Sequence, residues 1–223
     1  MKPYYDQDGI RIYHGDCREV LPKLEPVDLV LTDIPYGEVN RESGGLRSLD
    51  KGGADDVTFS LSDAVTFSSM LASSAYLWCG TEQASYLRAG FAFAGMSTRL
   101  CVWEKTNPSP MNGEYLWLSA LEVCIFARKP KAYFSEHCCS PVWRGATEGN
   151  DFHPTQKPEW LFRKLVKASC PEGGTVLDFC MGSGTTLRAA KDLGRKAIGI
   201  EIEDRYCEIA ARRLDQGVFA FSE

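Results

Sequence analysis

The sequence predicts an α/β protein with a doubly wound, mainly parallel sheet. Seven short segments have the apolar or alternating pattern of strands, and segments with helical spacing separate most of them. The apolar run at residues 27–31 lacks helical spacing, which is typical of a strand buried in a parallel sheet. Because 223 residues, 44% of them hydrophobic, suffice for one such core, we expect a single domain over residues 1–223.

The seven predicted strands differ in the signals that define them. The first alternates apolar and polar side chains, and the second is an apolar run interrupted by Asp28 alone. The third is an apolar run that ends in Gly80, and a loop with Pro108 and Pro110 separates the fourth from the fifth. In chain order the predicted strands are residues 10–14, 27–31, 75–80, 99–103, 121–128, 175–179 and 196–202.

The predicted helices are defined by spacing and by signals at their ends. The first is at most a short helix, because Pro22 limits it. Thr81 and Asp204 are candidate N-caps, and Gly95 follows the helix that Thr81 begins. Pro158 stands near the start of the amphipathic fourth helix. In chain order the predicted helices are residues 18–24, 61–72, 81–94, 159–170, 185–193 and 204–214.

The net charge of −5 argues against a uniformly basic nucleic-acid binder. Residues 1–98 carry a net charge of −6, residues 99–167 carry +3 and residues 168–223 carry −2. The middle part is therefore the only basic one, and phosphate contacts require a local basic face. Ordinary solvated lysines and arginines would give the same counts.

Composition also bears on the cellular compartment of the protein and on metal binding. No stretch approaches the ~20 apolar residues that span a bilayer, and residues 1–9 lack the apolar core of a signal peptide. We therefore expect a cytoplasmic protein with no membrane partner. None of the nine cysteines forms a C-x-x-C pair. The cluster His137-Cys138-Cys139 lacks zinc-ligand spacing, so no metal site is predicted.

The second predicted strand runs into the stretch Asp33-Ile34-Pro35-Tyr36. Pro35 has no N–H and cannot sit inside a central strand, so the strand must end here. An acid at the carboxyl end of a parallel strand lies where open α/β sheets bind ligands. On these four residues alone, an ordinary strand corner with a solvated Asp33 is an equally good interpretation.

A second constellation follows the sixth predicted strand, at Asp178 to Thr186. A strand leads through Gly182-Ser183-Gly184 into a helix, whose N-terminal N–H groups can meet a carboxylate or phosphate. Glu201 follows about 20 residues later, where an acid can hydrogen-bond a ribose. This pair of features is a nucleoside-cofactor signature. The third glycine of an NAD motif is replaced by Leu187, and the lysine of a P-loop is absent. A purely structural glycine turn stays open.

Together these stretches resemble the DNA amino-methyltransferases, which use S-adenosylmethionine and methylate adenine N6 or cytosine N4. Their usual catalytic motif is (Asp/Asn/Ser)-Pro-Pro-(Tyr/Phe/Trp). The order of catalytic motif, target region and cofactor glycines resembles the permuted β class, and the resemblance runs from about residue 10 to 214. It implies a seven-stranded, Rossmann-like methyltransferase sheet in circularly permuted order, with target-recognition insertions near residues 38–56 and 107–152.

The resemblance also implies where the cofactor binds. His14-Gly15-Asp16 matches the family's acid at the cofactor adenine, Glu201 its acid at the ribose, and Lys157 could meet the cofactor carboxylate or a nearby phosphate. The residues expected to bind the cofactor are Asp16, Cys17, Asp33, Thr155, Lys157, Asp178, Phe179, Cys180, Gly182, Ser183, Gly184, Thr185, Thr186, Glu201 and Ile202.

The catalytic residues implied by the resemblance are Asp33, Ile34, Pro35 and Tyr36. Asp33 can accept one N–H of the target amine and the Ile34 carbonyl the other, while Tyr36 stacks on a base flipped out of the duplex. Within the family an Asp in the first motif position leans toward adenine N6, so adenine is predicted and cytosine N4 is the alternative. Cytosine carbon-5 chemistry is not expected, because the catalytic strand offers no Pro-Cys pair.

The chain departs from the family pattern at two places. Ile34 stands where the first catalytic proline is usual, and Asp178-Phe179-Cys180 stands where Asp-Pro-Phe is usual. These departures keep open a second hypothesis, a non-catalytic nucleic-acid-binding protein that retains the fold. A third is methylation of RNA or of a protein glutamine, although those families usually carry the glycines before the catalytic motif.

Double-stranded DNA is the expected substrate. A homodimer that assembles a basic cleft from residues 99–167 would reconcile the acidic total with DNA binding, and a restriction endonuclease is a further candidate partner. The residues expected to contact DNA are Arg41, Arg47, Lys51, Lys105 and Arg144.

Overall fold

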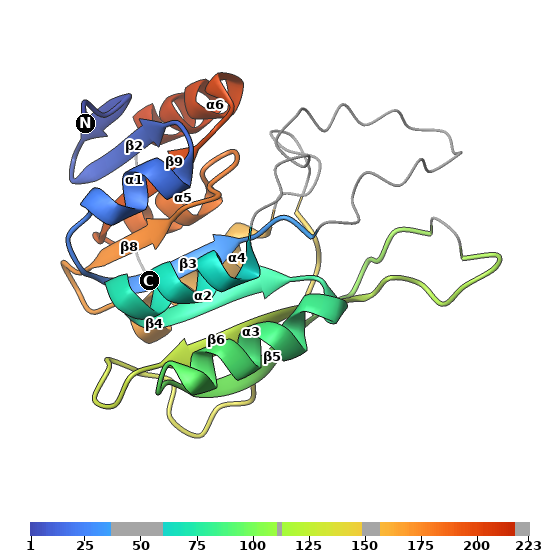
Figure 1. The fold of residues 1–223 in the computed structure, drawn as a ribbon. Helices are drawn as coiled ribbons and strands as arrows, with labels where there is room; N and C mark the ends of the chain where they lie inside the picture. Colours follow the sequence, from blue (N-terminus) through green and yellow to red (C-terminus); the bar gives the residue numbers. More distant parts are fainter. Residues whose placement is uncertain (37–59, 111–112, 149–156, 217–223) are drawn as a thin grey trace.

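The computed structural model describes residues 1–36, 60–110, 113–148 and 157–216, whose strands join into one nine-stranded sheet. The strand order is β1-β2-β9-β8-β3-β4-β6-β5-β7 (Figure 1). The five strands from β2 to β4 in this order are parallel, and β6 is antiparallel between β4 and β5. The strands are β1 (Tyr5–Gln7), β2 (Ile10–His14), β3 (Val27–Asp33), β4 (Ala72–Cys79), β5 (Ser97–Lys105), β6 (Leu121–Arg128), β7 (Val142–Gly145), β8 (Thr175–Asp178) and β9 (Lys196–Glu201).

The described residues therefore contain two strands more than the seven predicted. The additional strands, β1 and β7, are the two edges of the sheet, with three and four residues. Neither has a run of buried apolar side chains, and Tyr5 is the one buried residue of the two strands. Their strand character comes from pairing with β2 and β5, which a local sequence pattern does not report.

Helices cover both faces of the sheet, as the doubly wound prediction requires. One core cluster includes buried side chains of α1 (Cys17–Val20), α2 (Leu61–Leu71) and α3 (Thr81–Phe93). The other includes those of α4 (Glu159–Ser169), α5 (Thr185–Asp192) and α6 (Asp204–Asp215). A 3₁₀ turn, η1 (Leu21–Lys23), continues α1, so the first predicted helix is indeed short. No helix in the described part of the chain is long and apolar enough to cross a membrane.

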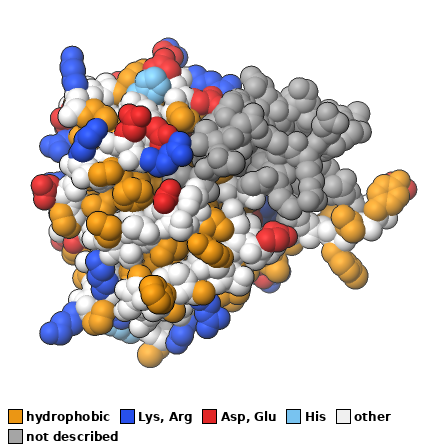
Figure 2. All heavy atoms as spheres, in the orientation of Figure 1, with side chains coloured by type: hydrophobic (Ala, Val, Ile, Leu, Met, Phe, Trp, Pro, Cys, Tyr) orange, Lys and Arg blue, Asp and Glu red, His pale blue; other side chains and the backbone are white. Residues whose placement is uncertain are grey.

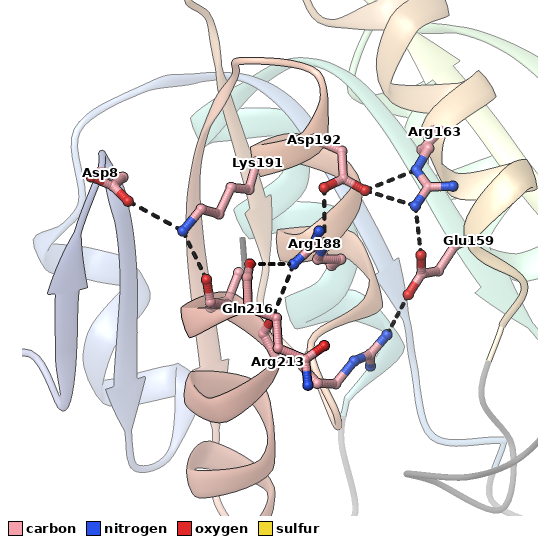
Figure 3. A network of polar contacts seen from close by, with 9 residues as sticks. Asp8, Glu159, Arg163, Arg188, Lys191, Asp192, Arg213 and Gln216 are labelled. Atoms are coloured by element: carbon pink, nitrogen blue, oxygen red, sulfur yellow. Dashed lines mark hydrogen bonds and ion pairs between the residues drawn. The ribbon is translucent and has the colours of Figure 1, made fainter. Parts of the chain in front are cut away.

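Ion pairs tie the helices α4, α5 and α6 together on their face (Figure 3). Glu159 at the start of α4 pairs with Arg163 at 2.6 Å and with Arg213 of α6 at 2.7 Å. Asp192 at the end of α5 pairs with Arg163 at 2.7 Å. The Arg213 guanidinium also donates to the Ser183 carbonyl at 2.7 Å. The network thereby supports the glycine turn that precedes α5.

The carboxyl ends of the parallel strands bring the predicted acids to one edge of the sheet. In the strand register His14 lies beside Glu201, Asp178 beside Gly199 and Asp33 beside Trp78. Asp33, Asp178 and Glu201 thus close neighbouring strands on the side where ligands of open α/β sheets bind.

Candidate active site

Asp33 is the last residue of β3, and both of its carboxylate oxygens have partners. The Tyr36 hydroxyl donates to Oδ1 at 2.8 Å, and the Lys157 ammonium donates to Oδ2 at 2.5 Å. Lys157 Nζ also lies 3.2 Å from Tyr36 Oη and 5.4 Å from the centroid of the Tyr36 ring. The Lys157 side chain is 6% exposed. A buried ammonium therefore joins the acid and the aromatic of the predicted catalytic motif.

Two further charges extend this contact across the sheet. Glu122 of β6 receives Lys157 Nζ at 3.1 Å on one oxygen and Lys105 Nζ of β5 at 2.6 Å on the other. We call Lys105, Glu122, Lys157 and Asp33 the charge row. It holds two cations and two anions in alternation, so each buried charge has a partner of opposite sign.

The charge row fixes the protonation states of its inner members. Burial acts to lower the pKa of Lys157, but the carboxylates of Asp33 and Glu122 oppose it and hold the pKa well above its ordinary value. Burial acts to raise the pKa of Glu122, and the ammonium groups of Lys157 and Lys105 bring it below its ordinary value. Burial, with the nearby Asp33, raises the pKa of Tyr36. At neutral pH Lys157 is therefore cationic, Glu122 anionic and Tyr36 a neutral phenol.

Ile34 replaces the usual proline and is firmly anchored. Its N–H donates to the Trp78 carbonyl at 3.1 Å, a bond that proline could not form, and its side chain is 1% exposed. The next carbonyl, of Pro35, accepts from the Gln83 amide nitrogen at 3.0 Å. The turn after β3 thus has backbone and core contacts in place of the rigidity of a second proline.

The predicted cofactor residues meet at the corner where β2, β9 and β8 end. The Gly15 N–H donates to the Glu201 carbonyl at 2.8 Å, and the Glu201 carboxylate accepts from the Gly182 N–H at 2.9 Å. The neighbouring thiols of Cys17 and Cys180 shift each other's pKa, that of Cys17 downward and that of Cys180 upward. The fold therefore joins the segment that contains Asp16 to the glycine turn.

Two carboxylates stand at neighbouring strand ends of this corner. Asp16 caps α1 by accepting from the Arg18 N–H at 2.9 Å, and the hydrogen bond from the Arg18 guanidinium lowers its pKa against the effect of burial. Burial raises the pKa of Glu201, whose second oxygen accepts from the Glu203 N–H at 2.9 Å. Ile202, which follows Glu201, is 40% exposed.

Other predicted cofactor residues brace the glycine turn from inside. The Thr186 hydroxyl donates to Asp178 Oδ2 at 2.5 Å, and the Cys180 N–H donates to Asp178 Oδ1 at 3.2 Å. The Phe179 side chain is 2% exposed and belongs to the core. Ser183 is 4% exposed, and its hydroxyl accepts from Arg213. These buried side chains therefore support the turn from the protein interior.

The turn itself suits an anionic group. Gly182 and Gly184 have φ angles of +50° and +81°, which side chains other than glycine rarely adopt. Gly184 leads into Thr185 and α5, whose N-terminus has no side-chain cap. Uncapped N–H groups and the two corner acids therefore match the carboxylate, adenine and ribose of a nucleoside amino acid such as S-adenosylmethionine.

The predicted contacts to DNA are placed only in part. Arg41, Arg47 and Lys51, like the cofactor candidate Thr155, lie outside the described residues, as does the insertion near 38–56. Lys105 belongs to the charge row, and its side chain is 16% exposed. The Arg144 side chain is 72% exposed and lies 3.3 Å from Glu104.

Glu122 is the site residue that sequence reasoning missed. The signal was a single carboxylate near the start of strand 121–128, which is otherwise apolar up to its last residue, Arg128. Lys157 was expected at the cofactor, whereas the structure places its ammonium between Asp33 and Glu122.

The N6_N4_Mtase family model, described as DNA methylase, matches residues 27–212. The chain belongs to this family. It is 30% identical to the Type II methyltransferase M2.LlaDCHI of Lactococcus lactis subsp. cremoris over 251 residues, 97% of this chain and 93% of that protein. It is also similar to the crystal structure of the M1.HpyAVI–SAM complex, with a TM-score of 0.74, 26% identity, and coverage of 93% of this chain and 100% of that one.

A fold likeness extends to the PvuII DNA methyltransferase (cytosine-N4-specific), with a TM-score of 0.76, 16% identity, and coverage of 98% of this chain and 91% of that one. The predicted family, fold class and cofactor are therefore confirmed. The chain is an S-adenosylmethionine-dependent DNA amino-methyltransferase of the N6/N4 family.

Proposed function

We propose that the acceptor is the N6 amine of adenine at a specific DNA site. The observation that carries this proposal is the Asp33 carboxylate at the end of β3, with the Tyr36 hydroxyl on it at 2.8 Å. In this family an Asp in the first motif position leans toward adenine. The relative from Lactococcus lactis is named a Type II methyltransferase. This name supports a role in restriction and modification for the present chain.

The charge row suggests how the amine is received. An exocyclic amine presents two N–H groups, which Asp33 and the Ile34 carbonyl would accept, leaving the nitrogen lone pair free to attack. One oxygen of Asp33 must first become available. The bond from Tyr36, whose donor is neutral, gives way more readily than the bond from Lys157, in which both donor and acceptor are charged. The Tyr36 ring is then free to stack on the base.

Lys157 also determines which task Asp33 performs. The Lys157 ammonium holds one oxygen of Asp33 at 2.5 Å, so the carboxylate orients the amine through the other oxygen, which Tyr36 releases. S-adenosylmethionine supplies the electrophilic methyl group. As the new C–N bond formed, the S–CH3 bond would break and S-adenosylhomocysteine would leave. The methylated nitrogen, then positively charged, would pass its proton to the Asp33 carboxylate that accepts its N–H.

Asp33→Asn tests the assignment. The amide keeps one acceptor oxygen but loses the charge and adds a donor, so methyl transfer should fall at least about 100-fold. Tritium transfer from labelled cofactor to unmethylated duplex DNA measures it, and nucleoside analysis identifies the product. Asp6→Asn, at an exposed carboxylate 3.5 Å from Arg11, is the matched control. Full activity of Asp33→Ala, which leaves no acceptor at this position, would remove Asp33 from the mechanism.

Cytosine N4 is the second candidate, because the family includes both amines. N4-methylcytosine as the product of the same assay would establish it. Cofactor binding by calorimetry without turnover on any DNA would favour the non-catalytic alternative. Sequencing DNA from an expressing host with modification-sensitive chemistry would give the base and its site together.

We also propose that the protein acts as a homodimer, whose two copies of residues 99–167 form a basic cleft. The net charge of +3 on that part of the sequence supports it. Sedimentation at micromolar concentration should give the dimer mass, and a monomer would contradict the proposal.

A further inference from the structure

Four apolar side chains stand exposed on the loop that joins β5 to β6. The exposed fractions are 80% for Tyr115, 69% for Leu116, 99% for Trp117 and 43% for Leu118. We call these four residues the apolar tip. Figure 1 shows the loop projecting away from the sheet to the right, and Figure 2 shows hydrophobic side chains gathered at the end of this projection. A solvent-exposed apolar group of this kind marks a contact surface.

Hydrogen bonds brace the loop at its base. The Lys105 N–H donates to the Ala120 carbonyl at 2.7 Å, and the Ala120 N–H donates to the Leu118 carbonyl at 2.8 Å. Asn107 Oδ1 accepts from the Thr147 N–H at 2.7 Å. The apolar tip is therefore presented on a supported stem and does not pack on the core.

The stem begins and ends at the charge row. Lys105 precedes the loop and Glu122 follows it, and Glu122 reaches Asp33 through Lys157. The tip and the catalytic carboxylate thus share the edge where the parallel strands end. A polymer that delivers one of its bases to Asp33 must lie along this edge.

The chemistry of the loop favours bases over phosphates. Residues 106–120 contain one charged side chain, Glu114, and no cation. Such a segment is unsuited to the phosphate backbone, whereas aromatic and aliphatic side chains fit the faces of unstacked bases.

We propose that the apolar tip is a wedge that enters the target duplex, with the Trp117 indole stacked on the bases that the extruded target leaves behind. The proposal rests on the proposed function, since only a reaction on an extruded base creates such a gap. Extrusion removes stacking on both sides of the target, and an inserted apolar side chain restores part of it.

Trp117→Ala tests the wedge, and Phe93→Ala is its matched control. Phe93 is 97% exposed at the end of α3, which returns to the opposite edge of the sheet. Affinity is measured by fluorescence anisotropy with 30-base-pair duplexes and S-adenosylhomocysteine. The duplexes carry, in unmethylated form, the sequence that is found methylated in DNA of the expressing host. Where no methylation is found, they carry a random sequence. We expect Trp117→Ala to weaken binding about tenfold or more, Trp117→Phe to recover most of it, and Phe93→Ala to have no effect.

A second measurement separates a wedge from a general contact. With 2-aminopurine at the target position, fluorescence reports extrusion. On a fully paired duplex, Trp117→Ala should give a smaller increase in 2-aminopurine fluorescence on protein binding than the wild type. On a duplex whose target is already mispaired the increase should stay the same, because that base is easier to extrude. Unchanged affinity and fluorescence would overturn the wedge, as would a reduced rise on both duplexes.

If the wild-type protein sediments as a dimer and Trp117→Ala as a monomer, the wedge is also overturned. The apolar tip would then belong to a contact between two copies of the chain. Failure of the proposed function looks different. In that case the wild-type protein transfers no methyl group to any DNA, while the dependence of DNA affinity on Trp117 still decides the wedge.

Discussion

Lys157 lies among two carboxylates, the Tyr36 phenol and the Trp78 ring, whose centroid is 5.8 Å from its ammonium. Removing one partner of a buried ion pair leaves a buried charge uncompensated, which costs about 3–5 kcal/mol. We expect Lys157→Met to lower the free energy of unfolding by about that amount in urea titrations. Lys23→Met, at an exposed position, is the control and should change it by less than about 0.5 kcal/mol.

The same logic predicts a partial rescue. Adding Glu122→Gln to Lys157→Met removes one of the two carboxylates that lost the ammonium, so the double variant should be more stable than the single one. A double variant that is less stable than Lys157→Met would show that the ion pair of Glu122 with Lys105 outweighs the cost of leaving Glu122 without Lys157.

Asp178 makes stability depend on pH. Burial raises the pKa of its carboxyl from 3.8 to about 7. Between those values the folded chain binds a proton that the unfolded chain has lost, so the contribution of Asp178 is full below about pH 4 and decreases as the pH rises to about 7. Asp178→Asn, whose amide oxygen can still accept from Thr186, should remove this dependence. Unfolding measured from pH 5 to 7.5 should show the wild type losing stability relative to the variant, and parallel curves would contradict it.

At the scale of single residues, the parts of the site that are contiguous in sequence could be predicted. Asp33 and Tyr36 follow one strand, and the glycine turn follows another, so local patterns sufficed to identify them. Glu122 reaches Asp33 through Lys157, which is 35 residues away from it, and no local pattern relates the two. For the same reason the contact of Lys157 with Asp33, across 124 residues, was not predicted.

Helix α5 lies between two glycines with positive φ. Substituting each of them by alanine separates the stability cost of backbone strain from the cost of a close packing contact. Gly184 before the helix has a φ of +81°, and a Cβ there would lie 2.8 Å from the Ala210 Cβ of α6. Gly194 after the helix has a φ of +67° and open space. We expect Gly194→Ala to cost about 1–2 kcal/mol for backbone strain alone. Gly184→Ala should cost about 1–3 kcal/mol more, because α6 must also move. Equal costs in urea unfolding would show that the contact with α6 adds nothing.

Among the other elements, those with an apolar run were predictable and those defined by pairing were not. The central strand β3 is visible in the sequence because it is buried on both faces. Strand β4 begins at Ala72, three residues before its predicted start, and its first part includes the fully buried Ser74. A serine reads as polar in sequence, and only its neighbours β3 and β6 make it part of a strand.

At the scale of the whole molecule, the alternation of strands and helices predicted the doubly wound sheet, because each strand must be covered on both faces. The convergence of acids on one edge follows from the parallel direction of β2, β9, β8 and β3. The permuted class stays a prediction, as do the roles assigned to the DNA-contacting residues and the partner endonuclease.

The strand order has a consequence for how the chain is made. Strands β2 and β3 are synthesised early, but they are not neighbours, and β8 and β9 from the last quarter of the chain lie between them. On a ribosome, β3 therefore has one edge without its native partner until residue 178 has emerged. Unpaired strand edges invite pairing with other chains, and long-range pairings form slowly. The centre of the sheet closes last among the described strands, so the catalytic strand acquires its cofactor-binding neighbour β8 only after all the strands from β4 to β7 have been made.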